Sequence, residues 1–111
     1  MTIITDDHMK QMIATTKNYS VVILKSGPNR DRDDLQKIIW EHGRRNFVLR
    51  AEGVLSIVCP VSDGTTFHGL GIFNRNEEET KKIMEDDPGV KAGIFTYEIH
   101  PARSFPGDSL P

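Results

Sequence analysis

The stretch that most constrains the fold of this chain is residues 31–53, DRDDLQKIIWEHGRRNFVLRAEG, because its apolar residues recur with the period of an α-helix. At about 100° per residue, one sector of this helix collects Leu35, Ile38, Ile39, His42, Asn46 and Leu49. A stripe of this width is typical of a helix that covers a hydrophobic core. The helix is expected to start within DRDD, where an aspartate can cap its backbone N–H groups, and to end at Gly53. His42 stands in the middle of the stripe, where an apolar residue is expected.

A titratable side chain on the buried face of a helix needs a hydrogen-bond partner. A buried polar group without one costs about 1–3 kcal/mol of stability. We therefore expect His42 to meet a polar group supplied by another element of the fold. The identity of that group is the main question that the sequence raises.

The composition indicates one domain and argues against several classes of partner. A chain of 111 residues is long enough to bury one core without metal or disulfide support. With 14 basic and 16 acidic side chains, the net charge of −2 does not favour nucleic acid or an anionic membrane surface. No apolar run approaches the roughly 20 residues of a membrane span, and the first residues do not resemble a signal peptide. The single cysteine, Cys59, suits a reducing compartment, so we expect a cytoplasmic protein.

Four short segments have the composition of β-strands, being rich in β-branched and aromatic residues and bounded by turn residues. They are residues 19–25, 54–61, 66–73 and 94–100. The second and third are separated by a Ser-Asp-Gly-Thr turn, which predicts a hairpin. Gly69 and Gly71 lie on one face of the third strand, where the lack of side chains permits a bulge or the close approach of another group.

A second helix is predicted between the third and fourth strands. Asn76 followed by Glu79 resembles a capping box and marks its start. The helix is expected to run to about Asp86, and Pro88 with Gly89 should stop it.

The order strand, helix, strand, strand, helix, strand predicts an α+β fold of the ferredoxin-like βαββαβ type. Its four-stranded antiparallel sheet would carry both helices on one face. The bare face of so apolar a sheet needs a cover, and a second copy of the chain is the expected one, giving a homodimer. We divide the chain into an N-terminal arm or short helix at 1–18, the α+β domain at 19–104 and a C-terminal tail at 105–111.

Three features together resemble a known family. They are His42 in the long helix, the strand sequence VLSIVCP at 54–60, and DDPGVKAG at 86–93. These resemble the YciI-related (YCII-like) family of the dimeric α+β barrel superfamily, whose relatives include muconolactone isomerase. The resemblance covers roughly residues 19–104, and the Asp-Pro-x-Val-x-Ala-Gly element is its most specific piece. The chain departs from the family pattern at Cys59, where the family has glycine, and in its additional N-terminal arm.

The resemblance implies a catalytic pair. In the family, a histidine of the first helix and the aspartate before the proline form the active site, and the matching positions are His42 and Asp87. A carboxylate beside an imidazole fixes its tautomer and stabilises its charged form, which makes a competent general acid or base. The resemblance thus implies isomerase- or lyase-like proton transfer on a small-molecule substrate, akin to dehydrohalogenase or muconolactone isomerase chemistry. Arg45, one turn from His42, is a weaker candidate for binding an anionic substrate group.

Other interpretations of these residues remain open. His42 and Asp87 could be a satisfied core histidine and a helix-end residue in a non-catalytic small-ligand-binding or accessory module with the same dimeric fold. A metal site built from His42, His68, His100 and Glu98 lacks the short-range spacing of zinc motifs, so neither a metal nor a cofactor is expected. A proline-rich C-terminal segment could instead serve a protein partner.

Two further features have mainly structural interpretations. Trp40, Gly43 and Phe47 form a second stripe on the long helix, which is either exposed as an interface or covered by the N-terminal arm. We expect the arm to cover it through Ile4, Met9 or Ile13. Cys59 is expected to be a small buried hydrophobic residue rather than a nucleophile.

Overall fold

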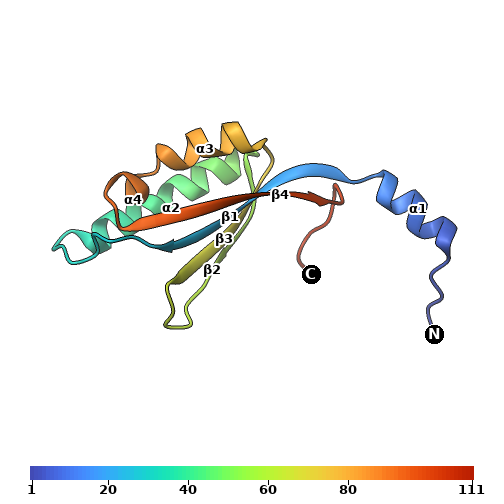
Figure 1. Cartoon of the computed structure of the whole chain (residues 1–111), viewed down its shortest axis with the longest axis horizontal. Helices are drawn as coiled ribbons and strands as arrows, with labels where there is room; N and C mark the ends of the chain where they lie inside the picture. The colour runs from blue at the N-terminus through green and yellow to red at the C-terminus, as the bar shows by residue number, and fades with distance from the viewer.

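A four-stranded antiparallel sheet with the order β2-β3-β1-β4 carries the fold in this computed structural model, which describes residues 1–111. The strands are β1 (Lys17–Ser26), β2 (Leu55–Pro60), β3 (Phe67–Phe73) and β4 (Phe95–Ser104). The helices are α1 (Asp6–Ala14), α2 (Leu35–Ala51), α3 (Glu77–Glu85) and α4 (Pro88–Lys91). Helices α2, α3 and α4 lie on one face of the sheet (Figure 1). The predicted ferredoxin-like βαββαβ arrangement is confirmed.

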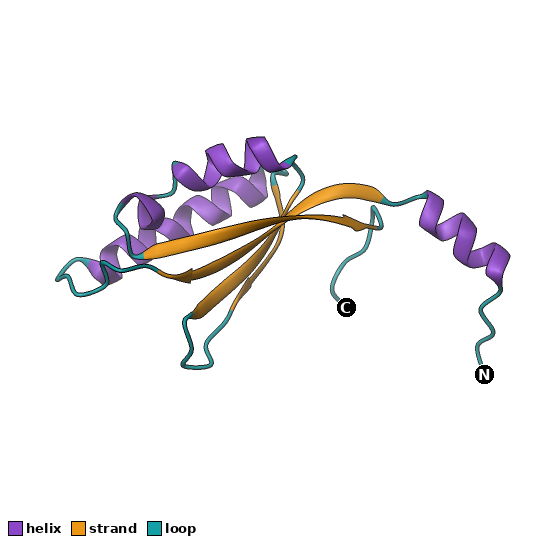
Figure 2. Ribbon diagram, in the orientation of Figure 1, coloured by secondary structure: helices purple, strands orange, loops and turns teal.

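Strand β1 is central because it pairs with β3 on one side and β4 on the other. Its side chains alternate between the two faces of the sheet, as the period of a strand requires. Ser20, Val22 and Leu24 point to the helices and are buried. Val21 and Ile23 point to the opposite face, which no helix covers, and are half-buried. The sheet therefore has one covered and one open apolar face (Figure 2).

The hydrophobic core lies between the covered face of the sheet and the helices. The predicted stripe of α2 faces it: Leu49 is buried, and His42 and the remaining members are half-buried. The core comprises nine buried residues, namely Val22, Leu24, Leu49, Val54, Leu55, Phe73, Met84, Ile94 and Phe95. The sequence period thus identified the correct face of the helix.

Helix α2 begins at Leu35, directly after the DRDD sequence in which its start is predicted. The acidic residues there do not cap it as expected. Asp34 occupies the N-cap position, but its carboxylate accepts hydrogen bonds from the Arg32 guanidinium at 2.6 and 3.1 Å and makes none to the helix backbone. The guanidinium therefore replaces the backbone N–H groups as the partner of Asp34.

Gly53 ends α2 as predicted, with a φ of +74° in the left-handed region. The backbone N–H of Val54 then donates to the Leu49 carbonyl at 2.9 Å, which satisfies a carbonyl of the last helical turn. The chain enters β2 directly from this turn.

Helix α3 starts as predicted, because the Asn76 side chain accepts a hydrogen bond from the Glu79 backbone N–H at 2.8 Å. Pro88 and Gly89 end α3 as predicted, but they do not lie in a loop. Pro88 opens the one-turn helix α4, with Asp87 as its N-cap, and the chain turns at Ala92 and Gly93. Proline is well suited to the first helical position, where the backbone N–H it lacks would have no helical partner.

The N-terminal arm stands away from the domain (Figure 2). The radius of gyration is 16.6 Å, against about 13 Å for a compact chain of this length. Strands β1 and β4 pair as far as Lys17 and Ser104, which carries α1 past the helical layer. The expected cover of the second stripe is therefore wrong: Trp40 is 70% exposed and Phe47 is 73% exposed. The apolar side chains of the arm are also exposed, namely Ile4, Met9, Met12 and Ile13.

Strand β4 ends at Ser104. None of the helices combines the length and the apolar character needed to cross a bilayer.

Substitution of two glycines of this helical segment should change stability in opposite directions. Gly53→Ala should lower the free energy of unfolding by about 1–2 kcal/mol, because a Cβ disfavours the left-handed conformation. Gly43→Ala should raise it by about 0.5–1 kcal/mol, because Gly43 lies inside α2 and a Cβ there meets no atom within 4 Å. Urea unfolding of both variants measures the difference. Equal effects of the same sign would contradict the role assigned to Gly53.

Candidate active site

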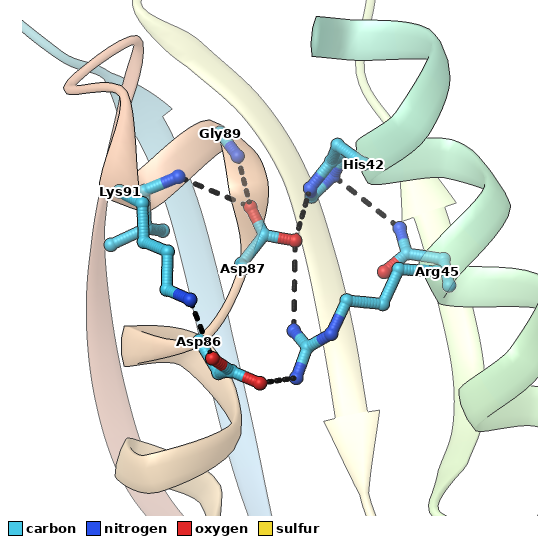
Figure 3. Close-up of polar contacts among 8 residues, drawn as sticks. His42, Arg45, Asp86, Asp87, Gly89 and Lys91 are labelled. Atoms are coloured by element: carbon cyan, nitrogen blue, oxygen red, sulfur yellow. Dashed lines mark hydrogen bonds and ion pairs between the residues drawn. The ribbon is translucent and has the colours of Figure 1, made fainter.

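The polar partner of His42 is Asp87, as the sequence predicts. The Nδ1 atom of His42 lies 2.8 Å from Oδ1 of Asp87. The two side chains are 12% and 2% exposed, so the pair is almost withdrawn from solvent. Figure 3 shows His42 reaching from α2 toward the carboxylate at the start of α4. The helix stripe and the Asp-Pro element, 45 residues apart, thus meet at one contact.

Asp87 is positioned by its role as the N-cap of α4. Its Oδ2 accepts hydrogen bonds from the backbone N–H groups of Gly89 at 2.9 Å and Val90 at 3.2 Å. The other oxygen, Oδ1, is left for His42 (Figure 3). Backbone donors and the helix dipole both stabilise an ionised carboxylate at such a position. The local fold of residues 87–91 therefore holds a buried carboxylate in one orientation.

This orientation determines which nitrogen of His42 is free. An ionised carboxylate only accepts hydrogen bonds, so Nδ1 of His42 carries a hydrogen and donates to Asp87. In the neutral imidazole Nε2 then carries a lone pair. The side-chain amide of Asn46 lies 3.4 Å from Nε2, which is a long contact compared with an ordinary hydrogen bond. Nε2 can consequently accept a proton from a substrate.

Arg45 contacts acidic side chains at the start of α4. Its guanidinium lies 3.7 Å from Asp87 and 4.0 Å from Asp86. Asp86 also forms an ion pair with Lys91 at 2.7 Å. The hydrogen bond from Lys91 is the main cause that lowers the pKa of Asp86, and the positive charges of Lys91 and Arg45 lower it further. Arg45 is not among the residues that line the cleft described next. Its positive charge faces both carboxylates, of which only Asp87 contacts His42.

A cleft of about 330 Å³ lies between α2 and the β2–β3 side of the sheet. His42 and Asn46 line it from α2. Its apolar wall includes Val22, Leu24, Leu55, Val58, Phe73 and Met84. Gly69 and Gly71 form part of its floor, and a Cβ on Gly71 would lie 3.1 Å from the Phe73 ring and 3.2 Å from Leu55. The close approach expected at these glycines is therefore present.

His68 enters this cleft because β3 is irregular at that point. Leu24 of β1 pairs with Gly69, but the next residue, Lys25, pairs with Phe67, so His68 has no partner on β1. A bulge of this kind redirects a side chain, and Nε2 of His68 lies 2.6 Å from Oγ of Ser26. From the sequence, His68 is a candidate only as a metal ligand. The Gly-x-Gly pattern permits a bulge in this strand, but it does not indicate that the side chain of His68 is the one redirected by it.

The environment of His68 disfavours its charged form. Burial lowers its pKa from the usual value most strongly, and the positive charge of Arg30 lowers it further, while Asp63 acts weakly in the opposite direction. Its ring lies 5.6 Å from that of Phe95, and the ring of His42 lies 4.8 Å from the same Phe95. Phe95 thus contacts both imidazoles of the cleft.

The residues that the sequence suggests as metal ligands do not lie at one site. His100 lies on β4 with its Nε2 3.1 Å from a Glu98 carboxylate oxygen, and both side chains are exposed. His42 and His68 line the cleft instead. No group of three or more histidine, cysteine, aspartate or glutamate side chains is arranged to hold a metal ion. Cys59 is a half-buried free thiol.

Comparison with known proteins gives a structural neighbour but no sequence relative. No protein-family profile and no curated protein matches this chain. Among solved structures, the chain is similar to 5-chloro-2-hydroxyhydroquinone dehydrochlorinase (TftG) from Burkholderia phenoliruptrix AC1100 in complex with 2,5-dihydroxybenzoquinone. The TM-score is 0.52 at 18% identity, and the match covers 74% of this chain and 90% of the neighbour. At this identity the likeness shows a shared α+β fold.

The two adjacent aspartates should differ sharply in their contribution to stability. Asp87→Ala should lower the free energy of unfolding by about 2–3 kcal/mol, because it leaves the α4 N–H groups and His42 without their acceptor. Asp86→Ala is the matched control and should cost less than about 1 kcal/mol, because its ion pairs are exposed. Chemical denaturation compares the two, and a similar loss in both would mean that Asp87 does not anchor α4.

Proposed function

We propose that this protein is a small-molecule enzyme that uses the His42–Asp87 pair for general acid/base proton transfer in an isomerase- or lyase-like reaction. The observation that carries this proposal is the 2.8 Å contact between the buried Asp87 and Nδ1 of His42, which lines a cleft. Such a pair directs the free Nε2 to act as the base.

In the proposed reaction, Nε2 of His42 removes a proton from a carbon of the substrate. The electron pair of the broken C–H bond moves into the substrate, and the imidazole becomes a cation. Asp87 stabilises that cation, while the α4 N–H groups and Arg45 keep Asp87 ionised and oriented. Return of the proton to another atom completes an isomerisation, and loss of a leaving group completes an elimination.

The size of the cleft supports a compact substrate. A volume of about 330 Å³ lies at the lower end of small-molecule sites, which span about 300–1,000 Å³. The neighbour of similar fold is named as a dehydrochlorinase of a substituted hydroquinone, and ring compounds of this kind are our first substrate candidates. The Asp-Pro-x-Val-x-Ala-Gly element supports membership of the YciI-related family, which we retain as part of the proposal. The single cysteine supports a cytoplasmic location.

The proposal is tested with a panel of halogenated hydroquinones and unsaturated lactones in deuterated water. We expect halide release or deuterium incorporation with at least one compound, followed by NMR. His42→Ala should lower that rate by about 10²–10⁴-fold, because the proton acceptor is lost. His8→Ala, in the exposed arm, is the matched histidine control and should retain the full rate. Full turnover by His42→Ala would contradict the mechanism, and saturable binding without conversion would favour a ligand-binding module.

A homodimer is the second part of the proposal. The open face of the sheet carries an apolar patch that includes Val21, Ile23, Leu70 and Ile72, all only partly covered within one chain. Burying such a surface against its own copy removes apolar area from water, and a two-fold arrangement closes the assembly. The cleft lies on the helical side of the sheet, so this assembly leaves it accessible.

A dimer formed through the open face of the sheet predicts that substitutions on two apolar surfaces affect the oligomeric state differently. The wild-type protein should show twice the mass of the chain by size-exclusion chromatography with light scattering. Ile23→Lys, on the open face, should give a folded monomer, because a charge would be buried at the interface. Trp40→Lys, on the outer side of α2, should remain a dimer. The reverse outcome for the two variants would place the interface on α2.

A further inference from the structure

Arg30 lines the cleft as a half-buried cation without a carboxylate partner. None of the ion pairs in the structure involves it. Its Nη1 donates to the Ile94 carbonyl at 2.9 Å, and its guanidinium carbon lies 5.6 Å from the centre of the Phe95 ring. These contacts orient the guanidinium but leave its charge uncompensated and most of its five N–H donors free.

The cleft has no carboxylate in its lining to balance the charge of Arg30. Its ionisable lining residues are Arg30, His42, His68 and the thiol of Cys59, and none is aspartate or glutamate. Asp87 lies behind His42, and its charge is already shared with Arg45 and the α4 backbone. A concave, largely apolar site with an unpaired cation favours an anionic ligand, because a low dielectric strengthens the attraction.

The Ser26–His68 pair adds hydrogen-bonding groups near Arg30. Burial and the charge of Arg30 lower the pKa of His68, which disfavours a second cation beside Arg30. Its Nε2 contacts Oγ of Ser26 at 2.6 Å. The Phe95 ring contacts Arg30, His42 and His68, so the cleft places the Arg30 guanidinium and both imidazoles around one aromatic ring.

We propose that Arg30, supported by Ser26 and His68, is an anion-binding subsite that holds an ionised oxygen of a ring-sized substrate. This inference rests on the proposed function, because it orients the substrate for proton transfer to His42. When the C–H bond breaks, its electron pair moves into a conjugated carbonyl group of the ring, whose oxygen gains negative charge, and the guanidinium stabilises that added charge. The substrate class is then a compact ring bearing a phenolate, enolate or carboxylate group.

Binding of two matched pairs of probes tests the subsite without turnover. Each pair compares an anion with a neutral analogue: 2,5-dihydroxybenzoquinone with its dimethyl ether, and benzoate with benzamide. Near neutral pH the wild-type protein should bind each anion more tightly than its analogue by calorimetry. Arg30→Gln should lower the affinity for the anions by about tenfold to a hundredfold, as expected for loss of charge-assisted hydrogen bonds. The affinity for the neutral probes should not change.

Three further variants separate charge from structure. Arg30→Lys should retain most of the preference for anions, because it keeps the charge. Arg44→Gln removes an exposed arginine of α2 outside the cleft and should bind as the wild type does. His42→Gln should bind the anions within about threefold of wild type. By NMR, the pKa of His68 should rise in Arg30→Gln, since a positive neighbour is removed, and should rise in the wild type when an anion binds.

The outcomes distinguish this inference from the proposed function. Equal affinity for anions and neutral analogues, no saturable binding of either anion, or an unchanged affinity in Arg30→Gln would overturn the subsite. Turnover that depends on His42 but not on Arg30 would also overturn it while leaving the acid/base function intact. Anion binding that depends on Arg30, without turnover of any compound, would support the subsite and count against the catalytic proposal.

Discussion

The buried carboxylate of Asp87 is the interaction on which the arrangement of this site depends. One of its oxygens caps α4 through two backbone N–H groups, and the other binds His42. A charge in so apolar a position is tolerated only when its hydrogen-bonding capacity is satisfied, and here backbone, imidazole and guanidinium share that task. The same contact joins α2 to the segment before β4, so it links the helical layer as well as orienting the imidazole.

Irregular backbone determines the rest of the cleft. A regular β3 would point His68 away from the helices, but the bulge turns it toward Ser26. Glycine at positions 69 and 71 leaves room above the sheet, where larger side chains would meet Phe73, Leu55 or the Cys59 carbonyl. The space so created is bordered by two imidazoles of different character: His42 contacts a carboxylate, whereas burial and the charge of Arg30 lower the pKa of His68.

Local rules explain where sequence reasoning failed. The acidic start of α2 suggested a capping aspartate, but Arg32 two residues away binds Asp34 more directly than the backbone does. Pro88 was treated only as a stop signal, although proline is also well suited to begin a helix. The N-terminal arm was expected to cover Trp40 and Phe47, but pairing of β1 with β4 as far as Lys17 carries it elsewhere. In each case the segment has two available contacts or roles, and its own sequence does not determine which one it adopts.

By itself, the sequence determined the element order, the core-facing side of α2, its end at Gly53 and the candidacy of His42 and Asp87, because these follow from periodicity, backbone preference and a short motif. Only the tertiary structure decided that Nδ1 of His42 meets Oδ1 of Asp87, that Arg45 supports the acid while Arg30 lines the cleft, and that His68 shares this cleft. These contacts join residues from separate elements, and their distances depend on strand register, the bulge and helix packing. No local pattern encodes those distances, because they arise from how all the elements pack together.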